Sequence, residues 1–273
     1  VETESDKYHI NAVIPDEIAG DNVYFWVSNG TGGENGWTRT EKVFVREKTE
    51  RPKEKLEVLK LSDFGAVPND GKSDSAAINS AISAARESGG AVLLFENGEY
   101  EISDEIKISG DFPYGLHLLG FGSTLSSDEY EYKGVSGGYT LLRFASPDRL
   151  PKNMISVYSD NVTISGMTIL GGESGGYECR NLFISAKNVT VSDTRMIKAD
   201  TRDFVKSGSA TLMCESNLEI DSGSENIALT GCEFHSKASA IQIGNDNFAW
   251  PAACFIASRT VRNVRISDCD IYG

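Results

Sequence analysis

Acidic side chains gather in the stretches KADTRDF and CESNLEID, which lie between Asn188 and Asn226, and in GNDNFAWP further along the chain. Two carboxylates that face one groove can cleave a glycosidic bond, one acting as the acid and the other as the base or nucleophile. The sequence therefore offers as catalytic candidates Asp200, Asp203, Glu215 and Asp246, with Glu219 and Asp221 in the wider set. The simpler interpretation of each is a solvated charge on a surface loop.

Three further side chains can contact a sugar near these carboxylates. Arg202 lies beside Asp203, and Trp250 can stack on a sugar ring. His235 follows the apolar Phe234 and is expected to point away from the core, where it can serve as an acid or a base. We take Arg202, Trp250 and His235 as substrate-binding candidates. The alternatives are a loop anchor packed on the core for Trp250 and an ordinary surface residue for His235.

The composition argues against several classes of protein. The chain has 273 residues, a net charge of −14 and a pI near 4.7. This acidity argues against nucleic acid, which is bound by clustered Lys and Arg, and makes a polyanionic substrate less favourable. Because no run of about 18 apolar residues occurs, we expect no membrane span. The first residues, VETESDKYHI, are polar and acidic and lack the pattern of a signal peptide.

One nine-residue phrase recurs four times and indicates how these residues are positioned. The copies NVTISGMTI, NVTVSDTRM, NIALTGCEF and NVRISDCDI begin at Asn161, Asn188, Asn226 and Asn263. Apolar residues in each copy alternate, skip one position and resume, which predicts a strand, a corner and a second strand. Stacking the copies in parallel, about 4.8 Å apart, buries their apolar faces. The unequal spacing predicts loops of different lengths on a constant core.

The asparagine that opens each phrase is expected at a corner, because asparagine tolerates unusual backbone angles. Stacked asparagine side chains can also form hydrogen bonds from coil to coil. Asn161 and Asn188 begin formal glycosylation sequons. We discount them as glycan sites because both would belong to the packed ladder.

The cysteines are odd in number and form no CxxC pair, which favours core thiols over disulfides or a metal site. They are Cys179, Cys214, Cys232, Cys254 and Cys269. Cys232 and Cys269 share one inward position in successive copies, so we expect buried neighbours that need no disulfide. Asp268 and Asp270 flank Cys269 and face outward. Calcium shared with a neighbouring coil is therefore an alternative to our expectation of no cofactor.

Two domains and a linker are expected. Residues 1–46 hold short apolar or alternating stretches, which predict a β-sandwich-like module with fewer strands than a complete sandwich. Residues 47–55, EKTERPKEK, have the composition of a linker. Residues 56–273 form the second domain, with a helix over 73–88 in which Ala and Ile recur at steps of three and four. Ser73 or Asp74 is expected to cap this helix, and Gly89 to end it.

Residues 61–103, LSDFGAVPNDGKSDSAAINSAISAARESGGAVLLFENGEYEIS, resemble the entry segment of the pectate-lyase-like superfamily. The resemblance implies an all-β fold, a right-handed parallel β-helix whose open end is covered by the helix. The superfamily includes polygalacturonases and other glycoside hydrolases, polysaccharide lyases, epimerases and phage tailspikes. WVSNGTGGENGW resembles part of the β-sandwich modules that precede such β-helices in secreted carbohydrate enzymes, which implies a secreted or cell-surface protein.

The catalytic pattern of polygalacturonase-like hydrolases does not carry over to this chain. In those enzymes an Asp-Asp pair precedes a Val/Ile-x-Ile strand, and a Gly-His-Gly lies on another coil. Here the comparable strand, 241–243 (IQI), follows ASA, and no Gly-His-Gly occurs. We expect either other carboxylates or catalytic coils beyond Gly273, because the last phrase ends in a strand with no cap after it.

These features together predict an extracellular carbohydrate-active enzyme, specifically a glycoside hydrolase that cleaves a polysaccharide with paired carboxylates in the β-helix groove. One alternative is a polysaccharide lyase, which needs Lys or Arg to hold a uronate. The other is a non-catalytic glycan-binding or tailspike-like surface protein. The expected partner is a polysaccharide or oligosaccharide, and neither nucleic acid nor a membrane. The glycan, the stereochemical course and the oligomeric state stay open.

Overall fold

The computed structural model describes most of the larger part of the chain and short pieces of the rest. The described residues are 3–5, 10–12, 22–28, 36–40, 43–44, 56–122, 139–144, 153–171, 173–174, 177–178, 180–197, 216–235, 240–244, 254–256 and 260–272. The catalytic candidates Asp200, Asp203, Glu215 and Asp246, and with them Arg202 and Trp250, lie outside these ranges. The chain divides into two compact units, Val1–Lys53 and Glu54–Gly273, and each is described by itself.

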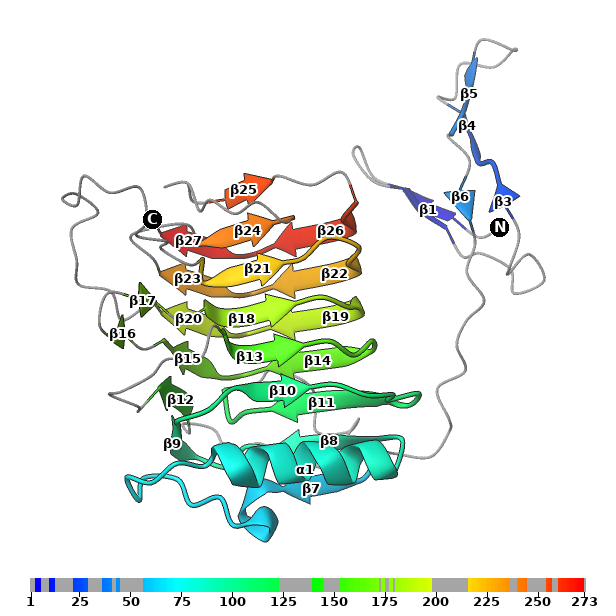
Figure 1. Cartoon of the computed structure of the whole chain (residues 1–273). Helices are drawn as coiled ribbons and strands as arrows, with labels where there is room; N and C mark the ends of the chain where they lie inside the picture. Colours follow the sequence, from blue (N-terminus) through cyan, green and yellow to red (C-terminus); the bar gives the residue numbers. More distant parts are fainter. Residues whose placement is uncertain are drawn as a thin grey trace, which may run out of the picture. The chain divides into compact units, whose positions relative to one another are not determined.

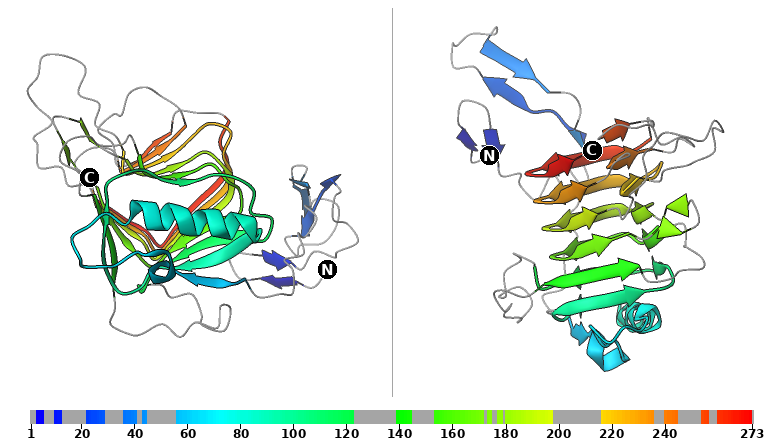
Figure 2. Two further views of the ribbon diagram at one scale, coloured as in Figure 1. Left: turned by 60° about the horizontal axis from the view of Figure 1, so that its bottom comes forward. Right: turned by 90° about the vertical axis from the view of Figure 1, so that its left-hand side faces the viewer.

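The larger unit consists of three parallel sheets whose strands stack as successive coils (Figures 1 and 2). Sheet 1 contains β7 (Val58–Lys60), β8 (Gly90–Leu94), β11 (Gly115–Leu119), β14 (Val162–Ser165), β19 (Lys187–Ser192), β22 (Glu225–Thr230) and β26 (Arg262–Ser267). Sheet 2 contains β9 (Gly98–Ile102), β12 (Thr140–Phe144), β15 (Thr168–Leu170), β20 (Arg195–Ile197), β23 (Glu233–His235) and β27 (Asp270–Tyr272). Sheet 3 contains β10 (Ile106–Ile108), β13 (Asn153–Val157), β18 (Arg180–Ile184), β21 (Leu218–Ile220), β24 (Ile241–Ile243) and β25 (Cys254–Ile256).

The chain visits the three sheets in turn, as in β19, β20 and β21, so the unit is a parallel β-helix. A short antiparallel pair, β16 (Glu173–Ser174) and β17 (Tyr177–Glu178), lies between β15 and β18 along the chain. No helix in the described residues is long and apolar enough to cross a membrane.

The register of sheet 1 confirms the columns predicted from the repeated phrase. Val162 pairs with Val189, Val189 with Ile227, and Ile227 with Val264. The first three side chains are buried, and one apolar core cluster continues through the coils. The polar residues that alternate with them therefore form the outer face of the sheet.

The asparagine ladder is also confirmed. Asn161, Asn188, Asn226 and Asn263 have φ values of 63°, 56°, 58° and 53°. This left-handed region costs other non-glycine residues about 1–2 kcal/mol. The amide Nδ2 of each later asparagine donates to the Oδ1 of the one before it, at 3.1, 2.8 and 2.9 Å. Backbone shape and side-chain bonding thus select the same residue type at every corner.

Helix α1 (Ser75–Glu87) packs on the first coil and lies across the end of the stack (Figures 1 and 2). Its buried residues Ile78, Ala81, Ile82 and Ala85 belong to the same core cluster as the strands. The 3-10 helix η3 (Leu61–Phe64) precedes it and ends at Gly65, which has a φ of 91°. Apolar side chains of the first coil are therefore covered by a helix instead of by another coil.

The ends of α1 differ in part from the prediction. Asp74 is the N-cap residue, but its side chain makes no capping hydrogen bond. Its carboxylate accepts hydrogen bonds from the N–H groups of Val67 (2.9 Å) and Glu101 (3.2 Å) instead. Burial raises the pKa of this carboxyl group. At the other end, Gly89 follows the C-cap Ser88 with a φ of 77°, as expected for the residue that ends a helix.

The smaller unit contains three antiparallel strand pairs among its described residues. These are β1 (Thr3–Ser5) with β2 (Ile10–Ala12), β3 (Asn22–Val23) with β6 (Val43–Phe44), and β4 (Trp26–Ser28) with β5 (Trp37–Arg39). The Arg39 guanidinium lies 4.5 Å from the Tyr24 ring centre and 5.9 Å from that of Trp26. Tyr24, Trp26 and Trp37 are exposed.

We predict that Asn188→Ala lowers the free energy of unfolding by about 2–5 kcal/mol. The variant loses two ladder hydrogen bonds, at about 0.5–1.5 kcal/mol each, and places alanine in the left-handed region. Asn188→Gly loses the same bonds without the backbone cost, so it should be the more stable of the two. Guanidinium unfolding checks this order. Equal stability of the two variants would contradict a backbone role for the asparagine.

We predict that Cys269 reacts with iodoacetamide at pH 8 much faster than Cys232. Both cysteines are free, but the prediction that both are buried is wrong for Cys269: Cys232 is 1% exposed, whereas Cys269 is only half-buried. Burial raises the pKa of the Cys232 thiol to about 12, which leaves very little reactive thiolate at this pH. Peptide mass spectrometry after timed alkylation measures both sites. Equal labelling of the folded protein would show that the Cys232 position is open to solvent.

Candidate functional site

The outer face of sheet 3 carries one residue from each successive strand at the same register. The row runs Lys107, Ser156, Phe183, Glu219, Gln242. Glu219 belongs to it because its neighbours Leu218 and Ile220 are core residues and side chains alternate along a strand. Ser156, Glu219 and Gln242 are nevertheless buried. Buried polar groups lose their contact with water and need partners within the protein.

A chain of polar contacts connects two carboxylates across this face. The Arg180 guanidinium forms an ion pair with Glu219, in which Nη2 lies 2.6 Å from Oε2, and it donates through Nη1 to Asn153 Oδ1 at 3.2 Å. Asn153 Nδ2 donates to Ser156 Oγ at 2.9 Å, and the Ser156 hydroxyl donates to Glu105. Glu105 and Glu219 therefore lie at the two ends of a chain of three polar residues. We call these five residues the sheet 3 polar chain.

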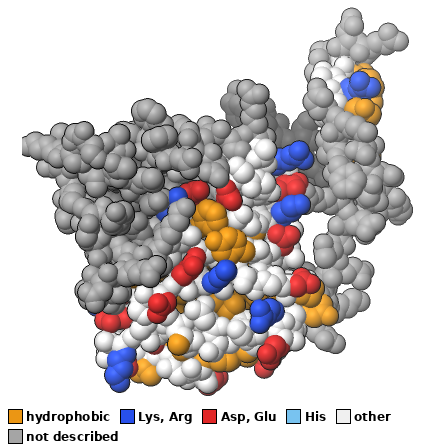
Figure 3. Space-filling view, viewed as in Figure 1, with side chains coloured by type: hydrophobic (Ala, Val, Ile, Leu, Met, Phe, Trp, Pro, Cys, Tyr) orange, Lys and Arg blue, Asp and Glu red, His pale blue; other side chains and the backbone are white. Residues whose placement is uncertain are grey.

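Aromatic rings lie beside the polar chain. The Tyr158 and Phe183 rings are 5.8 Å apart, and Tyr158 is 44% exposed. Lys107 Nζ lies 5.4 Å from the centre of the Tyr158 ring, and the Arg180 guanidinium lies 5.8 Å from that of Phe183. Aromatic rings next to fixed polar groups suit a sugar, which presents both C–H faces and hydroxyls. Figure 3 shows hydrophobic, basic and acidic side chains interspersed over the described part of the face in view.

Two buried asparagines fix the strands that carry the polar chain. Asn181 Nδ2 donates to Asn217 Oδ1 at 2.9 Å and to the carbonyl of Ile197 at 3.0 Å. Asn217 Nδ2 donates to the carbonyl of His235 at 2.7 Å. These bonds hold the corner between sheets 2 and 3 next to Arg180. The sequence analysis missed this second ladder, although the pattern Asn-Leu-x-Ile at 181–184 and 217–220 signals it.

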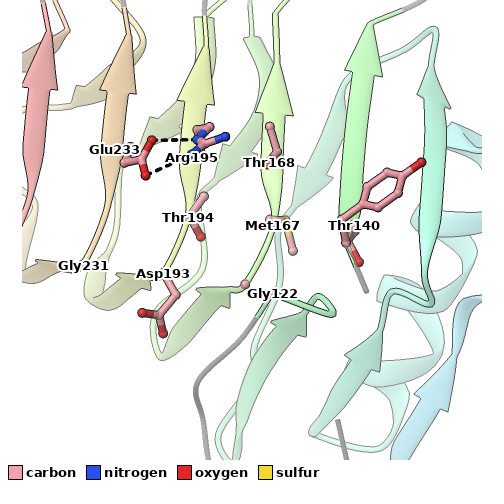
Figure 4. Close-up of a pocket in the computed structure, with 11 residues that line it drawn as sticks. Gly122, Thr140, Met167, Thr168, Asp193, Thr194, Arg195, Gly231 and Glu233 are labelled. Atoms are coloured by element: carbon pink, nitrogen blue, oxygen red, sulfur yellow. Dashed lines mark hydrogen bonds and ion pairs between the residues drawn. The ribbon is translucent and has the colours of Figure 1, made fainter. Parts of the chain in front are cut away.

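A separate surface lies on sheet 2, around an ion pair (Figure 4). Arg195 donates through Nε to Glu233 Oε2 at 2.7 Å and through Nη2 to Oε1 at 3.1 Å. His235 Nε2 lies 3.3 Å from the same Oε2, and its ring stacks on Tyr272 with centres 4.6 Å apart. The hydrogen bond from Arg195, followed by that from His235, holds the pKa of Glu233 below its usual range. The bond to Glu233 in turn raises the pKa of Arg195.

A hollow of about 290 Å³ adjoins this ion pair at the corner between sheets 1 and 2. Tyr139, Met167, Thr168, Asp193, Arg195 and Glu233 supply side chains to its lining, and Figure 4 shows how those that it labels lie. The remaining lining residues are Thr140, Thr194 and the glycines at 122, 166 and 231.

The described candidates from the sequence fall on different surfaces. Glu219 lies in the sheet 3 polar chain, and nearby Asp221 accepts a hydrogen bond from the Ser185 hydroxyl at 3.1 Å. His235 points outward as predicted, but it belongs to sheet 2 and contacts Glu233. The structure therefore does not bring His235 together with Glu219. The sequence analysis named neither Arg180 nor Glu233.

The calcium alternative stays a prediction. Asp268 and Asp270 are exposed, and within the described ranges no group of three or more His, Cys, Asp or Glu side chains is placed to hold a metal ion. Calcium prefers six to eight oxygen ligands. We therefore derive no chemical step through this ion.

Residues 58–273 match the family described as rhamnogalacturonase A/epimerase, pectate lyase-like. The match spans most of the chain, so the chain belongs to this pectate-lyase-like family. The resemblance of residues 61–103 is thereby confirmed. No curated protein matches the chain.

Two solved structures share the fold. One is a protein from Parabacteroides merdae that is proposed to be a glycosyl hydrolase; it aligns with a TM-score of 0.53 and 13% identity, over 78% of this chain and 95% of its own. The other is the Streptococcus pneumoniae surface protein and adhesin PfbA, with a TM-score of 0.50 and 16% identity, over 78% of this chain and 61% of its own. The chain thus spans less than two thirds of PfbA. At these identities the likeness shows the fold alone.

We predict that Glu233→Gln lowers stability by no more than about 1 kcal/mol at pH 7, because both partners of the ion pair are partly exposed. The pKa of Glu233 is lower in the folded protein, so the pair stabilises the fold above the ordinary glutamate pKa, near 4.3. That contribution is lost as the pH falls through the lowered value. Guanidinium unfolding of both proteins from pH 7 to acid should show the difference shrinking. A difference that grows in acid would contradict this assignment.

Proposed function

We propose that this chain acts on a polysaccharide at the outer face of sheet 3 and that the reaction is hydrolysis of a glycosidic bond. Membership of the pectate-lyase-like family supports a carbohydrate partner. The observation that carries the proposal is the buried Arg180–Glu219 pair beside the Tyr158 and Phe183 rings. It combines a fixed carboxylate with an apolar platform on one face of the solenoid.

Each group on this face has a role in the proposed reaction. The Tyr158 and Phe183 rings contact the C–H faces of sugar units, and Gln242 and Asn153 bind hydroxyls. Arg180 holds the Glu219 carboxylate in one orientation, where it can accept a proton from water or stabilise positive charge on the sugar. The surrounding buried groups limit competition from bulk water.

Hydrolysis needs a second carboxylate. Glu105 stands at the other end of the sheet 3 polar chain and is one choice. The other choices are the predicted residues Asp200, Asp203, Glu215 and Asp246. Separate substitution of each residue to its amide distinguishes them, because only the true partner should reduce turnover as strongly as Glu219.

A polysaccharide lyase is the second candidate, and two cations favour it. Lys107 and Arg180 both adjoin the Tyr158–Phe183 platform. Lyase chemistry removes a proton beside a uronate carboxylate and requires cations to hold that carboxylate. A rise in absorbance near 235 nm, which reports the new double bond, separates this reaction from hydrolysis.

An extracellular location belongs to the same proposal, since the polysaccharides that such enzymes degrade are largely found outside cells. A glycan-binding protein without activity is the remaining outcome. It would retain polysaccharide on a column and release neither reducing ends nor the unsaturated product.

We predict that Glu219→Gln reduces turnover of the polysaccharide substrate by at least about 100-fold, the usual contribution of a positioned acid or base. Reducing-end release from a panel of neutral and uronic polysaccharides measures it. Glu225→Gln is the matched control, because it also removes an ion-paired glutamate, that of Lys187, from another sheet and should leave turnover unchanged. Full activity in Glu219→Gln would contradict the proposed role.

Loss of a buried partner can also unfold the protein, because it leaves the Arg180 charge uncompensated. The double variant Arg180→Gln/Glu219→Gln removes both charges and keeps the fold testable by circular dichroism. A folded double variant without turnover supports the proposal. A folded double variant with normal turnover places the chemistry elsewhere.

A further inference from the structure

The hollow between sheets 1 and 2 lies on a different side of the coils from the sheet 3 polar chain. Successive coils pass this corner at Gly166, Asp193 and Gly231, with φ values of 71°, 47° and 62°. In the preceding coil the corresponding corner is entered at Gly122 and left at Tyr139. The hollow is therefore bordered by a short corner on three coils and by Tyr139 on the fourth.

Glycine keeps the hollow open. A Cβ added at Gly122 would lie 3.0 Å from the carbonyl oxygen of Gly166, and one at Gly231 would lie 3.0 Å from Asp193 Oδ1. Glycine backbone thus forms this part of the wall, because a larger residue there would collide with neighbouring atoms. The volume of about 290 Å³ is at the lower end of ligand pockets, which span roughly 300–1,000 Å³. It suits a single sugar unit of a longer glycan.

The lining carries both kinds of contact that a sugar ring needs. Tyr139, which is 54% exposed, borders the hollow, while Met167 is an almost fully buried apolar residue in the wall. Thr168 contributes a hydroxyl, and Asp193 and Glu233 contribute carboxylate oxygens that accept from sugar hydroxyls. Arg195 has five N–H donors, of which Glu233 accepts two.

The charge of the lining selects among sugars. Two carboxylates, Asp193 and Glu233, stand against one guanidinium, that of Arg195. The hydrogen bond from Arg195 holds the pKa of Glu233 below its usual range, which favours the ionised form. A uronate would add a further negative charge next to these two carboxylates, which is unfavourable. A neutral hexose or pentose meets no such repulsion.

We propose that this hollow is a second glycan-binding site, which takes a neutral sugar unit of the polysaccharide while another part of the same polymer lies on sheet 3. The carbohydrate nature of the ligand rests on the proposed function. The site itself is independent of catalysis, because it shares no residue with the sheet 3 polar chain. Binding at two places raises the effective concentration of the polymer at sheet 3.

The test compares hollow variants with a matched control from the same sheet. Arg195→Ala and Tyr139→Ala each truncate a residue that lines the hollow. Arg143→Ala removes an ion-paired arginine, bound to Glu99 and Glu101, from the outer face of sheet 2 but outside the hollow. All three are made in the Arg180→Gln/Glu219→Gln double variant, so that bound glycan is not consumed. Gluco-, manno-, galacto- and xylo-oligosaccharides are the neutral probes, and galacturonic and alginate oligosaccharides are the uronic ones.

Hydrogen exchange measured by mass spectrometry localises the bound sugar, and calorimetry gives the dissociation constant. We expect a neutral probe to protect the peptides around residues 166–168 and 193–195. We also expect Arg195→Ala and Tyr139→Ala to abolish this protection and to weaken the site at least tenfold, whereas Arg143→Ala stays within twofold. Protection by uronic probes alone, protection that survives both substitutions, or no protection by any neutral probe would overturn the inference.

The outcomes separate this inference from the proposed function. Turnover by the native chain with no hollow-dependent binding would refute the second site and leave sheet 3 as the place of reaction. Hollow-dependent binding with no turnover of any polysaccharide would keep the second site and refute the hydrolytic function. If the second site does not exist, Arg195→Ala should leave the Michaelis constant for the polymer unchanged. If the second site binds the polymer, Arg195→Ala should raise this Michaelis constant without a change in kcat.

Discussion

At each corner of every coil the chain must bend so that the next strand again directs the same apolar positions into the core. The stacking of the coils follows from this bend. At the corner before sheet 1 the requirement is met by Asn161, Asn188, Asn226 and Asn263, which combine a left-handed backbone with hydrogen bonds from coil to coil. Equivalent residues of successive strands in sheet 1 then pair in parallel register, because each strand begins at the same distance from its asparagine. With register fixed, every outward residue acquires a defined neighbour on the next coil.

That neighbour relation explains both surfaces of interest. Arg180 and Glu219 are far apart in sequence, yet strands β18 and β21 are adjacent and bring them into contact at 2.6 Å. Arg195 and Glu233 meet in the same way on β20 and β23. Short corners, as from β14 to β15 and from β19 to β20, favour this arrangement between sheets 1 and 2, although the connection from β11 to β12 is long. Most connections between sheets 2 and 3 are longer and differ in length from coil to coil, and the proposed reaction face lies beside them.

Features that repeat within a short phrase were predictable from the sequence. The inward columns, the asparagine ladder and the Cys232–Cys269 neighbours each follow from residue types at a fixed register. Arg180 was missed because an arginine outside the repeated phrase has the pattern of a surface residue, and its partner lies across a segment of unpredictable length. His235 was correctly predicted to point outward. The alternation of apolar and polar residues along one strand does not show, however, to which sheet that strand belongs. The Asp74 side chain failed as a helix cap because two backbone N–H groups from other segments compete for its carboxylate.

The asparagine corners and the longer connections between sheets 2 and 3 differ in how readily their sequences can change during evolution. Insertions between sheets 2 and 3 need not disturb the asparagine corner, so that loop can be remodelled residue by residue while the thermodynamic cost stays local. Substitutions at Gly122 or Gly231 meet backbone or side-chain atoms at once and have little latitude. Selection for a new glycan would therefore act more freely on the connections between sheets 2 and 3 than at these glycine corners.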